Sequence, residues 1–371
     1  MERVRVGVIG TGAISGAYLG MAKNFPIVEI AACADLNKEA AQKKAAEFGV
    51  TRVLSVDELI ADPSIEIVLN LTIPKAHVPV SMRAIEAGKH TYLEKPLGVD
   101  REDGRKLLDA ARKKNLRVGC APDTFLGVGI QTARKLIDDG AIGRPVAFTA
   151  FMMGPGHESW HPNPQFYYEA GGGPMFDMGP YYLTALLNLL GPVKRVMGMA
   201  TIAIADRTIG SQPLKGTKIR VETPDHIAGT IEFENGAMGT IIQSFATRFA
   251  EFGGPHRQPI TIFGTGGTMR VPDPNQFDGP VHVRRNEDAE WTQSPHPFVA
   301  GYGRSVGLAD MAYAIRSGRP HRCSAEQAFA VLEVMQAFLD SSSKGAAVKP
   351  SGAYSRPAPM RADLPFGTLD A

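Results

Sequence analysis

Several stretches of this 371-residue chain combine residue types that could do chemistry. The first is a glycine-rich turn, Gly10-Thr11-Gly12-Ala13-Ile14, placed where a strand pattern passes into a helix pattern. Gly10 permits a sharp turn and Gly12 permits close approach of a pyrophosphate, while the start of the helix offers unpaired N–H groups to phosphates. We therefore expect a dinucleotide to bind at these five residues.

An acidic residue, Asp35, ends the second strand pattern at the distance from the glycines that a ribose-binding acid requires. Its carboxylate can accept hydrogen bonds from the adenosine ribose diol and would repel a 2′-phosphate, which predicts NAD in preference to NADP. A helix cap for residues 37–48 is a structural role compatible with this one. Ser15 departs from the third glycine of the motif but is small enough for packing.

A lysine follows the fifth strand pattern in the sequence Glu94-Lys95-Pro96. Ligands of open parallel sheets bind at the carboxyl ends of the strands, so Lys95 is expected to face the cofactor crevice and to hold a substrate hydroxyl. The alternative is a solvated surface charge.

A second glycine-rich stretch, residues 171–173, leads into Asp177-Met-Gly-Pro-Tyr181 and a helix pattern. Asp177 and Tyr181 stand four residues apart and can share one face at the start of the helix. The alternative assigns Asp177 to a helix cap and Tyr181 to the core. Upstream, His157, Trp160 and His161 offer ring donors and a flat apolar face that suit a pyranose ring, unless they only cover the surface. No third ligand has metal-binding spacing, so no metal is expected.

The elements that must position these residues change in type along the chain. From residue 4 to residue 121, short apolar strand patterns alternate with helix patterns, which is typical of a doubly wound parallel sheet. Beyond residue 125, longer alternating patterns and an Asn235-Gly236 hairpin signal predict a mostly antiparallel sheet with a few helices. We therefore expect an α/β protein with two domains, 1–124 and 125–371.

Composition limits the partners. The 40 Lys+Arg and 38 Asp+Glu give a net charge of +2, which provides no phosphate-seeking surface and argues against nucleic acid. Three dispersed cysteines predict buried thiols in a reducing compartment. The apolar stretch 178–193 is shorter than the roughly 20 residues that span a bilayer, and no signal peptide is visible at the N-terminus. A cytoplasmic protein without a membrane partner is expected.

The ordered motifs Val8-Ile9-Gly10-Thr11-Gly12, Glu94-Lys95-Pro96 and Asp177-x-Gly-x-Tyr181 resemble the Gfo/Idh/MocA oxidoreductase family. The resemblance implies an N-terminal Rossmann domain and a C-terminal α/β domain whose large open mixed sheet lines the substrate cleft and often mediates oligomerisation. It also implies hydride exchange between NAD(P) and a sugar, polyol or related carbinol, and a homodimer or homotetramer formed through the C-terminal sheet.

Residue roles follow from the same resemblance. Lys95 and Asp177 match the motif lysine and aspartate. Many members hold histidine at the position of Tyr181, but glucose–fructose oxidoreductase and its close relatives resemble this chain in holding tyrosine there. Tyr181 is then the acid/base, with the Lys95 ammonium favouring its phenolate and Asp177 orienting Lys95 or a substrate hydroxyl. Four residues follow the fourth strand, where the family binds the nicotinamide half of the cofactor: Asn70, Thr72, Pro74 and His77. A turn-forming role is the alternative for this segment. Glu94 and Lys95 are also expected to contact the cofactor.

Two other functions remain open at this point. Some relatives use tightly held NAD to oxidise a glycoside transiently, eliminate a substituent and reduce the product, so that the net reaction is that of a lyase or glycosidase. A non-catalytic NAD-binding sensor would need the glycines but not the ordered set Lys95, Asp177 and Tyr181, and that set argues against it.

Overall fold

The computed structural model describes residues 1–248, 258–352 and 354–370, and the chain forms two compact units. The first unit comprises Met1–Gly127, Pro297–Phe329 and Pro357–Ala371, and the second comprises Val128–His296 and Ala330–Arg356. The chain therefore passes between the units more than once, whereas the sequence patterns suggested one division near residue 124. That division remains a prediction for the functional domains.

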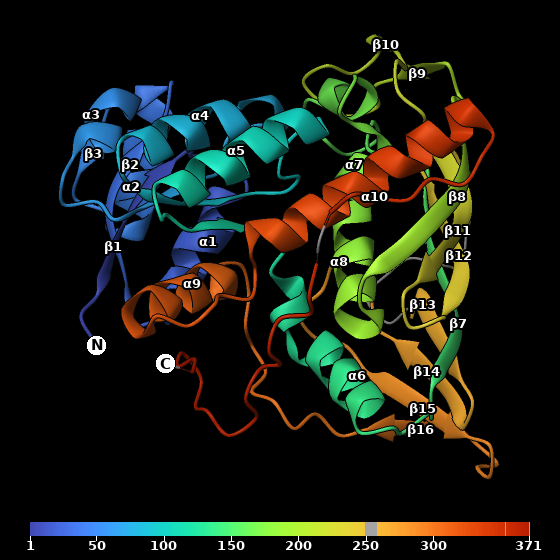
Figure 1. The fold of residues 1–371 in the computed structure, drawn as a ribbon. Helices are drawn as coiled ribbons and strands as arrows, with labels where there is room; N and C mark the ends of the chain where they lie inside the picture. Colours follow the sequence, from blue (N-terminus) through green and yellow to red (C-terminus); the bar gives the residue numbers. More distant parts are fainter. Residues whose placement is uncertain (249–257, 353, 371) are drawn as a thin grey trace. The chain divides into compact units, whose positions relative to one another are not determined.

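The first unit is built on a six-stranded sheet in the order β3-β2-β1-β4-β5-β6, with every pair of neighbours parallel (Figure 1). Its inner strands are almost entirely buried, as the apolar runs predict. This confirms the predicted doubly wound fold. The strands are β1 (Val4–Ile9), β2 (Val28–Ala34), β3 (Val53–Leu54), β4 (Ile67–Asn70), β5 (His90–Leu93) and β6 (Val118–Cys120).

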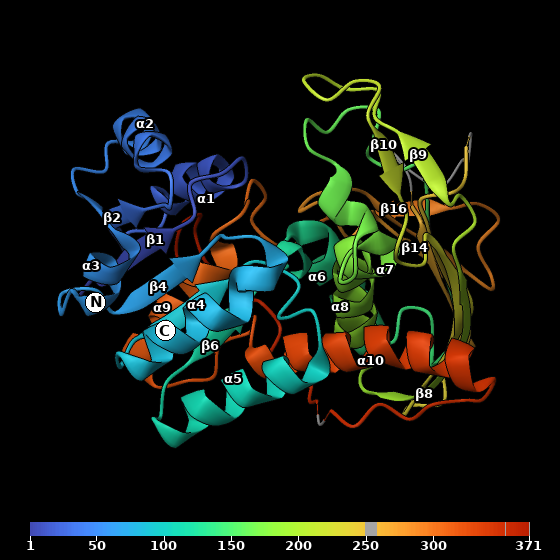
Figure 2. The same ribbon diagram turned by 90° about the horizontal axis from the view of Figure 1, so that it is seen from above.

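Helices cover both faces of this sheet. Helices α1 and α9 contact each other on one side, and α4 and α5 contact each other on the other side (Figures 1 and 2). Local caps set several ends: the Asn37 side chain accepts a hydrogen bond from the Ala40 N–H, and Gly49 ends α2 at φ +76°. The helices are α1 (Ser15–Ala22), α2 (Lys38–Phe48), α3 (Val56–Ala61), α4 (Pro74–Glu86), α5 (Arg101–Lys113) and α9 (Val306–Ser317), with the 3₁₀ turn η1 (Thr124–Leu126).

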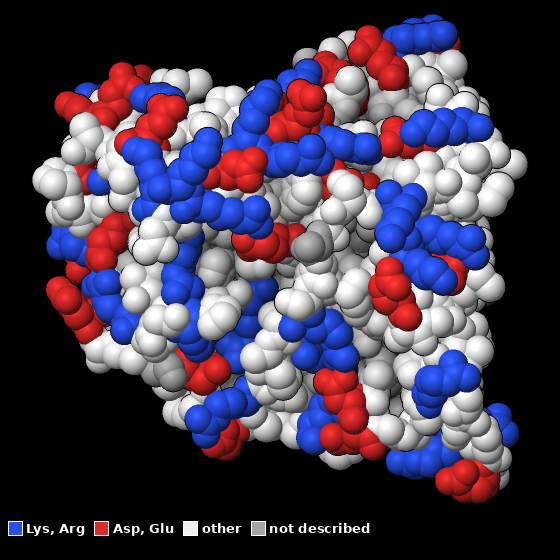
Figure 3. All heavy atoms as spheres, in the orientation of Figure 1, with Lys and Arg blue, Asp and Glu red and all other residues white. Residues whose placement is uncertain are grey.

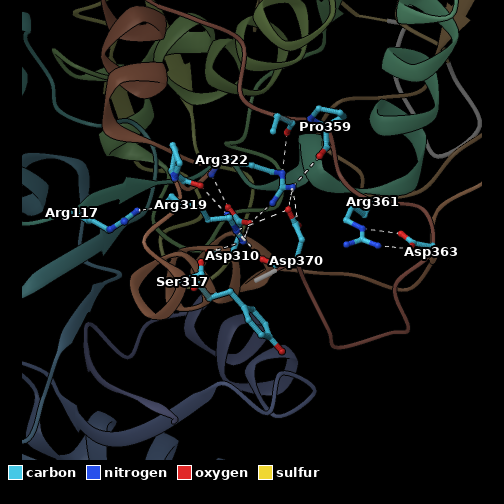
Figure 4. A network of polar contacts seen from close by, with 12 residues as sticks. Arg117, Asp310, Ser317, Arg319, Arg322, Pro359, Arg361, Asp363 and Asp370 are labelled. Atoms are coloured by element: carbon cyan, nitrogen blue, oxygen red, sulfur yellow. Dashed lines mark hydrogen bonds and ion pairs between the residues drawn. The ribbon is translucent and has the colours of Figure 1, made fainter. Parts of the chain in front are cut away.

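A buried ion-pair network ties the C-terminal residues to α9 (Figure 4). The fully buried carboxylate of Asp310 accepts hydrogen bonds from the Arg319 guanidinium at 2.8 Å and the Arg322 N–H at 2.6 Å. Arg322 also donates to both oxygens of Asp370 at 2.8 Å. Because the buried charges of Asp310 and Arg322 have opposite partners, the network holds the late segments of the first unit in place.

The second unit contains an eight-stranded sheet in the order β16-β15-β14-β13-β7-β12-β11-β8. All neighbours are antiparallel except β7 and β12, which confirms the predicted mostly antiparallel mixed sheet. Its strands are β7 (Pro145–Met153), β8 (Val193–Thr201), β11 (His226–Phe233), β12 (Met238–Ser244), β13 (Ile260–Gly264), β14 (Gly267–Val271), β15 (Val281–Arg285) and β16 (Thr292–Ser294). A separate two-stranded ribbon pairs β9 (Asp206–Thr208) with β10 (Lys218–Arg220).

The described helices of this unit pack on one face of the large sheet. Helix α6 contacts β14 and β15, α7 contacts β11 and β12, and Phe338 of α10 lies against Gly198 and Gly229. Since strand side chains alternate, Met197, Met199 and Met238 point to the opposite face, where they are more than half exposed. These helices are α6 (Val128–Asp138), α7 (Gly173–Asp177), α8 (Gly179–Leu190) and α10 (Ala325–Lys344), with the 3₁₀ turn η2 (Gln165–Tyr168).

Three whole-chain features bear on partners and location. None of the described helices is both long and apolar enough to cross a membrane. Cys33, Cys120 and Cys323 are buried free thiols, and burial raises the pKa of Cys33 to about 11. On the face drawn in Figure 3, acidic and basic side chains are interspersed, in keeping with the net charge of +2.

Candidate functional site

The two glycines after β1 have different surroundings. Gly10 adopts φ +98°, and a Cβ placed there would lie 2.7 Å from the Leu71 carbonyl carbon and oxygen. A Cβ on Gly12 would meet no atom within 4 Å. Gly10 therefore serves the fold, by allowing the turn and the close approach of residue 71, whereas Gly12 leaves open space at the start of α1.

Asp35 lies at the carboxyl end of β2 and is held by the glycine turn itself. Its Oδ2 accepts hydrogen bonds from the Thr11 N–H at 2.7 Å and the Thr11 hydroxyl at 2.9 Å, and its Oδ1 accepts from the Asn37 N–H at 2.9 Å. Partial burial would raise the pKa of Asp35, but these hydrogen bonds outweigh it and lower the pKa. Asn37, and not Asp35, caps α2. The carboxylate is thus a fixed anion beside the turn.

Two exposed apolar side chains lie near these residues in the sequence, and no sequence pattern pointed to them. Leu36, directly after Asp35, is 98% exposed, and Ile73, between β4 and α4, is 66% exposed. Hydrogen bonds hold both neighbours of Leu36, Asp35 and Asn37, yet the leucine side chain itself has almost no contacts. An apolar side chain exposed in this way could pack against the flat face of a ligand ring. The available signal was a single apolar residue in the polar link Asp35-Leu36-Asn37.

The polar residues at and after the end of β4 form hydrogen bonds with other residues of the chain. Asn70 is fully buried; its amide donates to the His77 carbonyl at 2.9 Å and the Ser81 hydroxyl at 3.1 Å, and its oxygen accepts from Thr72. His77 is also buried, with Nδ1 2.7 Å from the Pro96 carbonyl and Nε2 3.0 Å from the Thr72 carbonyl. Burial lowers the pKa of His77, although both carbonyls and Glu94 act in the opposite direction. These contacts brace the turn from β4 into α4, which Pro74 opens.

The Glu94-Lys95-Pro96 segment leaves β5 next to that turn. Glu94 is buried and accepts hydrogen bonds from the Tyr18 hydroxyl at 2.7 Å and the Lys95 N–H at 2.9 Å. His77 binds the Pro96 carbonyl, so both ends of the segment are anchored. Glu94 thus holds the backbone that presents Lys95, and its proposed contact with a cofactor remains a prediction.

In the second unit, Asp177 ends α7 and Tyr181 lies in the first turn of α8. Asp177 Oδ2 is 2.8 Å from Nε2 of His157, so the loop histidine and the motif aspartate form a pair. Tyr181 is 6% exposed. Met178 occupies the cap position of α8, so the capping role considered for Asp177 does not occur at this helix.

The residues proposed to contact sugar lie in one aromatic cluster. The His157 ring lies 4.2 Å from Tyr167 and 5.1 Å from Trp160 between ring centroids, and Trp160 lies 5.4 Å from His161. Trp160 is 60% exposed, so one large aromatic side chain of the cluster is free to meet a ligand. Burial lowers the pKa of His161.

A network of charged residues supports the loop that carries His157, and no motif or spacing in the sequence pointed to it. Arg207 donates to Glu158 at 2.9 Å and to Asp225 at 2.8 Å, and its guanidinium lies 4.8 Å from the Tyr168 ring centroid. The Tyr168 hydroxyl donates to Glu158 and accepts from the His157 N–H at 3.0 Å. Residues far apart in sequence thus fix positions 157 and 158.

These observations define the class of protein. One unit has the doubly wound fold of dinucleotide-binding proteins, and the other has a mixed sheet and the hydrogen-bonded pair Asp177 and His157. Two sequence comparisons then identify the family. Residues 4–121 match the oxidoreductase family with an NAD-binding Rossmann fold, and residues 130–270 match the GFO/IDH/MocA C-terminal domain. The chain belongs to the Gfo/Idh/MocA family and is an NAD-binding oxidoreductase.

Named relatives and a solved structure agree with this assignment. The chain is 28% identical to 1,5-anhydro-D-fructose reductase of Ensifer adhaerens, over 71% of this chain and 74% of that protein. It is 29% identical to levoglucosan dehydrogenase of Pseudarthrobacter phenanthrenivorans, over 72% of this chain and 73% of that protein. A structure of levoglucosan dehydrogenase with NADH and L-sorbose is 25% identical, with a TM-score of 0.79, and covers 95% of this chain and 100% of that one.

Proposed function

We propose that this protein transfers a hydride between NAD and a secondary hydroxyl or ketone of a sugar, polyol or related carbohydrate. The observation that carries the proposal is the open space at Gly12, next to the carboxylate of Asp35 that the same turn holds in place. The chain also has Lys95, Asp177 and Tyr181 in the order of the family motifs. Relatives named as a reductase of 1,5-anhydro-D-fructose and a dehydrogenase of levoglucosan support a carbohydrate substrate.

The residues of the first unit fit NAD. The space above Gly12 and the helix start behind it suit a pyrophosphate, and the exposed Leu36 side chain suits an adenine face. Asp35 keeps lone pairs for a ribose diol, and its negative charge opposes a 2′-phosphate. We propose NAD in preference to NADP on this ground. Thr11, Ala13 and Ile14 complete the proposed phosphate-binding turn, and Thr72 and Pro74 the nicotinamide side.

The proposed chemistry divides between hydride and proton. A bound nicotinamide supplies hydride transfer. Lys95 and Tyr181 form the proposed acid/base pair, in which the lysine charge favours the phenolate of a group whose ordinary pKa is about 10. Asp177 orients the substrate hydroxyl or the lysine. Acid/base assistance of this kind contributes about 10²–10⁴-fold in rate.

Substrate binding and assembly are proposed for the second unit. Trp160 offers a flat apolar face for a pyranose ring, and His157 and His161 offer ring nitrogens for its hydroxyls. The exposed methionines on the outer face of the eight-stranded sheet support a homodimer or homotetramer formed through that sheet. Three buried free thiols support a cytoplasmic location.

A panel of sugars and polyols, offered with NAD and NADP in turn, tests the proposal through NADH absorbance and product analysis. We expect NADH to accumulate with at least one substrate and with NAD above NADP. Product formed without net NADH would instead indicate the oxidation, elimination and reduction cycle. No product of either kind with any panel member would contradict the proposed function.

Two variants assign the residues. Lys95→Met and Tyr181→Phe should lower kcat by about 10²-fold or more, since each removes a proposed acid/base group, while NADH binding measured by fluorescence stays within a few-fold of the wild type. Unchanged turnover in either variant would refute its assignment. Lost NADH binding would show a structural role instead.

A further inference from the structure

His157, in the loop after β7 of the second unit, is held by contacts of both its backbone and its ring. Its backbone N–H donates to the Tyr168 hydroxyl at 3.0 Å, and Tyr168 in turn donates to Glu158, which accepts a hydrogen bond from the buried Arg207. Its ring is packed by Tyr167 at 4.2 Å and Phe245 at 4.6 Å between centroids. The His157 imidazole therefore has a fixed position and a fixed plane.

Asp177 decides which ring nitrogen carries the proton. A carboxylate accepts hydrogen bonds, so the 2.8 Å contact with Asp177 Oδ2 assigns N–H to Nε2. A neutral imidazole has one N–H, which leaves the lone pair on Nδ1. Nδ1 has no hydrogen-bond partner among the residues that the structure describes, and the side chain is 17% exposed. The pair thus presents one basic nitrogen and stabilises the cation that forms when this nitrogen is protonated.

We propose that His157 is a second general acid/base of the carbohydrate oxidation, with Asp177 fixing its tautomer; this role rests on the proposed function. The substrate O–H bond breaks and its proton forms an N–H bond at Nδ1. The O–H electron pair becomes the second bond of the carbonyl as a hydride leaves the carbon for the nicotinamide co-reactant. The imidazolium, paired with Asp177, then returns the proton to water, and the steps reverse in the direction of reduction.

The ordinary pKa values of the two side chains favour the imidazole as the proton acceptor in this step. An ordinary imidazole titrates near pH 6.5 and an ordinary phenol near pH 10, so at neutral pH an imidazole accepts a proton more readily than a tyrosine does. His157 therefore accepts the substrate proton, and Tyr181 hydrogen-bonds the substrate oxygen.

His157→Gln is the matched test, because the glutamine amide can still donate to Asp177 but takes up no proton near neutral pH. We expect kcat/KM to fall by about 10²-fold or more and its pH profile to differ from that of the wild type, because the proton acceptor is gone. His282→Gln, on β15 with Nδ1 bonded to Gln258, controls for loss of an imidazole and should match the wild type. His157→Gln combined with Asp177→Asn should be no worse than the more damaged single variant, since the two residues act as a unit.

Ring ¹⁵N NMR gives a readout that needs no turnover. The wild type should show the His157 signal, identified by its loss in His157→Gln, as the Nε2–H tautomer in the neutral form. The Nδ1–H tautomer, or a His157→Gln variant with full kcat/KM and an unchanged pH profile, would overturn the role of His157 alone. A wild-type chain that turns over no sugar or polyol would overturn the proposed function and this role together.

Discussion

Gly10 and Gly12 stand two residues apart in one motif, yet alanine should affect them in different ways. At Gly10 an alanine would need φ +98° and would overlap the backbone of residues 71 and 72, so we expect Gly10→Ala to lower the free energy of unfolding by about 2–5 kcal/mol. At Gly12 a Cβ meets nothing, so Gly12→Ala should keep the stability of the wild type. Because that space is where we propose a pyrophosphate, NADH affinity should fall about tenfold or more.

Denaturant unfolding and NADH fluorescence titration measure the two effects separately. Each variant is the control for the other, since both add one methyl group to the same turn. Wild-type NADH affinity in Gly12→Ala would contradict the pyrophosphate position, and wild-type stability in Gly10→Ala would contradict the assigned backbone role.

The sequence identified residue positions better than residue partners. The glycine turn and Asp35 lie where the motif spacing predicts, and Asp177 does come together with His157 from the proposed sugar loop. Asn70 and Glu94 form buried hydrogen bonds within the chain, and their contact with a cofactor stays a prediction. A sequence shows that a polar residue follows a strand, but which buried group will need it as a partner depends on segments distant in sequence.

At the scale of elements, the short apolar strand patterns of residues 4–121 correspond to strands such as β1, β2 and β5, and the longer alternating patterns beyond residue 125 correspond to strands such as β7 and β11. The short strands β3, β9 and β10 and the short helix α3 were missed, because two to six residues hold too little periodicity to be recognised. Helix α9 belongs to the first compact unit, although it lies far beyond residue 125 in the sequence. That membership depends on contacts between residues nearly two hundred positions apart, such as those of Asp123.

Asp123 follows β6 and forms hydrogen bonds with the start of α9. Its titration should change the free energy of unfolding. Its buried carboxylate accepts hydrogen bonds from the Ser305 N–H at 3.0 Å and the Gly307 N–H at 3.2 Å. Burial raises the pKa of Asp123 to about 6, whereas an unfolded aspartate titrates near 3.9. The folded state therefore binds this proton more tightly, so this residue adds stability as the pH falls from 7 to 5 and removes it as the pH rises through 6.

The expected contribution is about 1 kcal/mol between pH 7 and pH 5, obtained from those two pKa values. Asp123→Asn should remove that increment from the pH dependence of the free energy of unfolding, measured by urea denaturation at both values. Asp109→Asn, at an exposed position on α5, should keep the wild-type increment. A variant Asp123→Asn with the same increment as the wild type would show that another group titrates in this range.

At the scale of the whole molecule, the outer face of the eight-stranded sheet sets the expectation for assembly. Met197 and Met199 on β8 and Met238 on β12 are 54%, 78% and 53% exposed, and the described helices pack on the opposite face. Apolar side chains gathered on a sheet face are typical of a surface that is covered in an oligomer.

If the proposed oligomer pairs two sheets, Met199→Glu should convert it to a monomer, because the pairing would bury a glutamate from each copy without a partner. Light scattering after size exclusion measures the mass, and unfolding and NADH titration should show an intact first unit. Leu214→Glu adds the same charge at another exposed apolar position, outside the eight-stranded sheet, and should leave the mass unchanged. A wild-type monomer at assay concentration, or a Met199→Glu variant with the wild-type oligomeric mass, would assign the exposed methionines another role and place any subunit contact elsewhere.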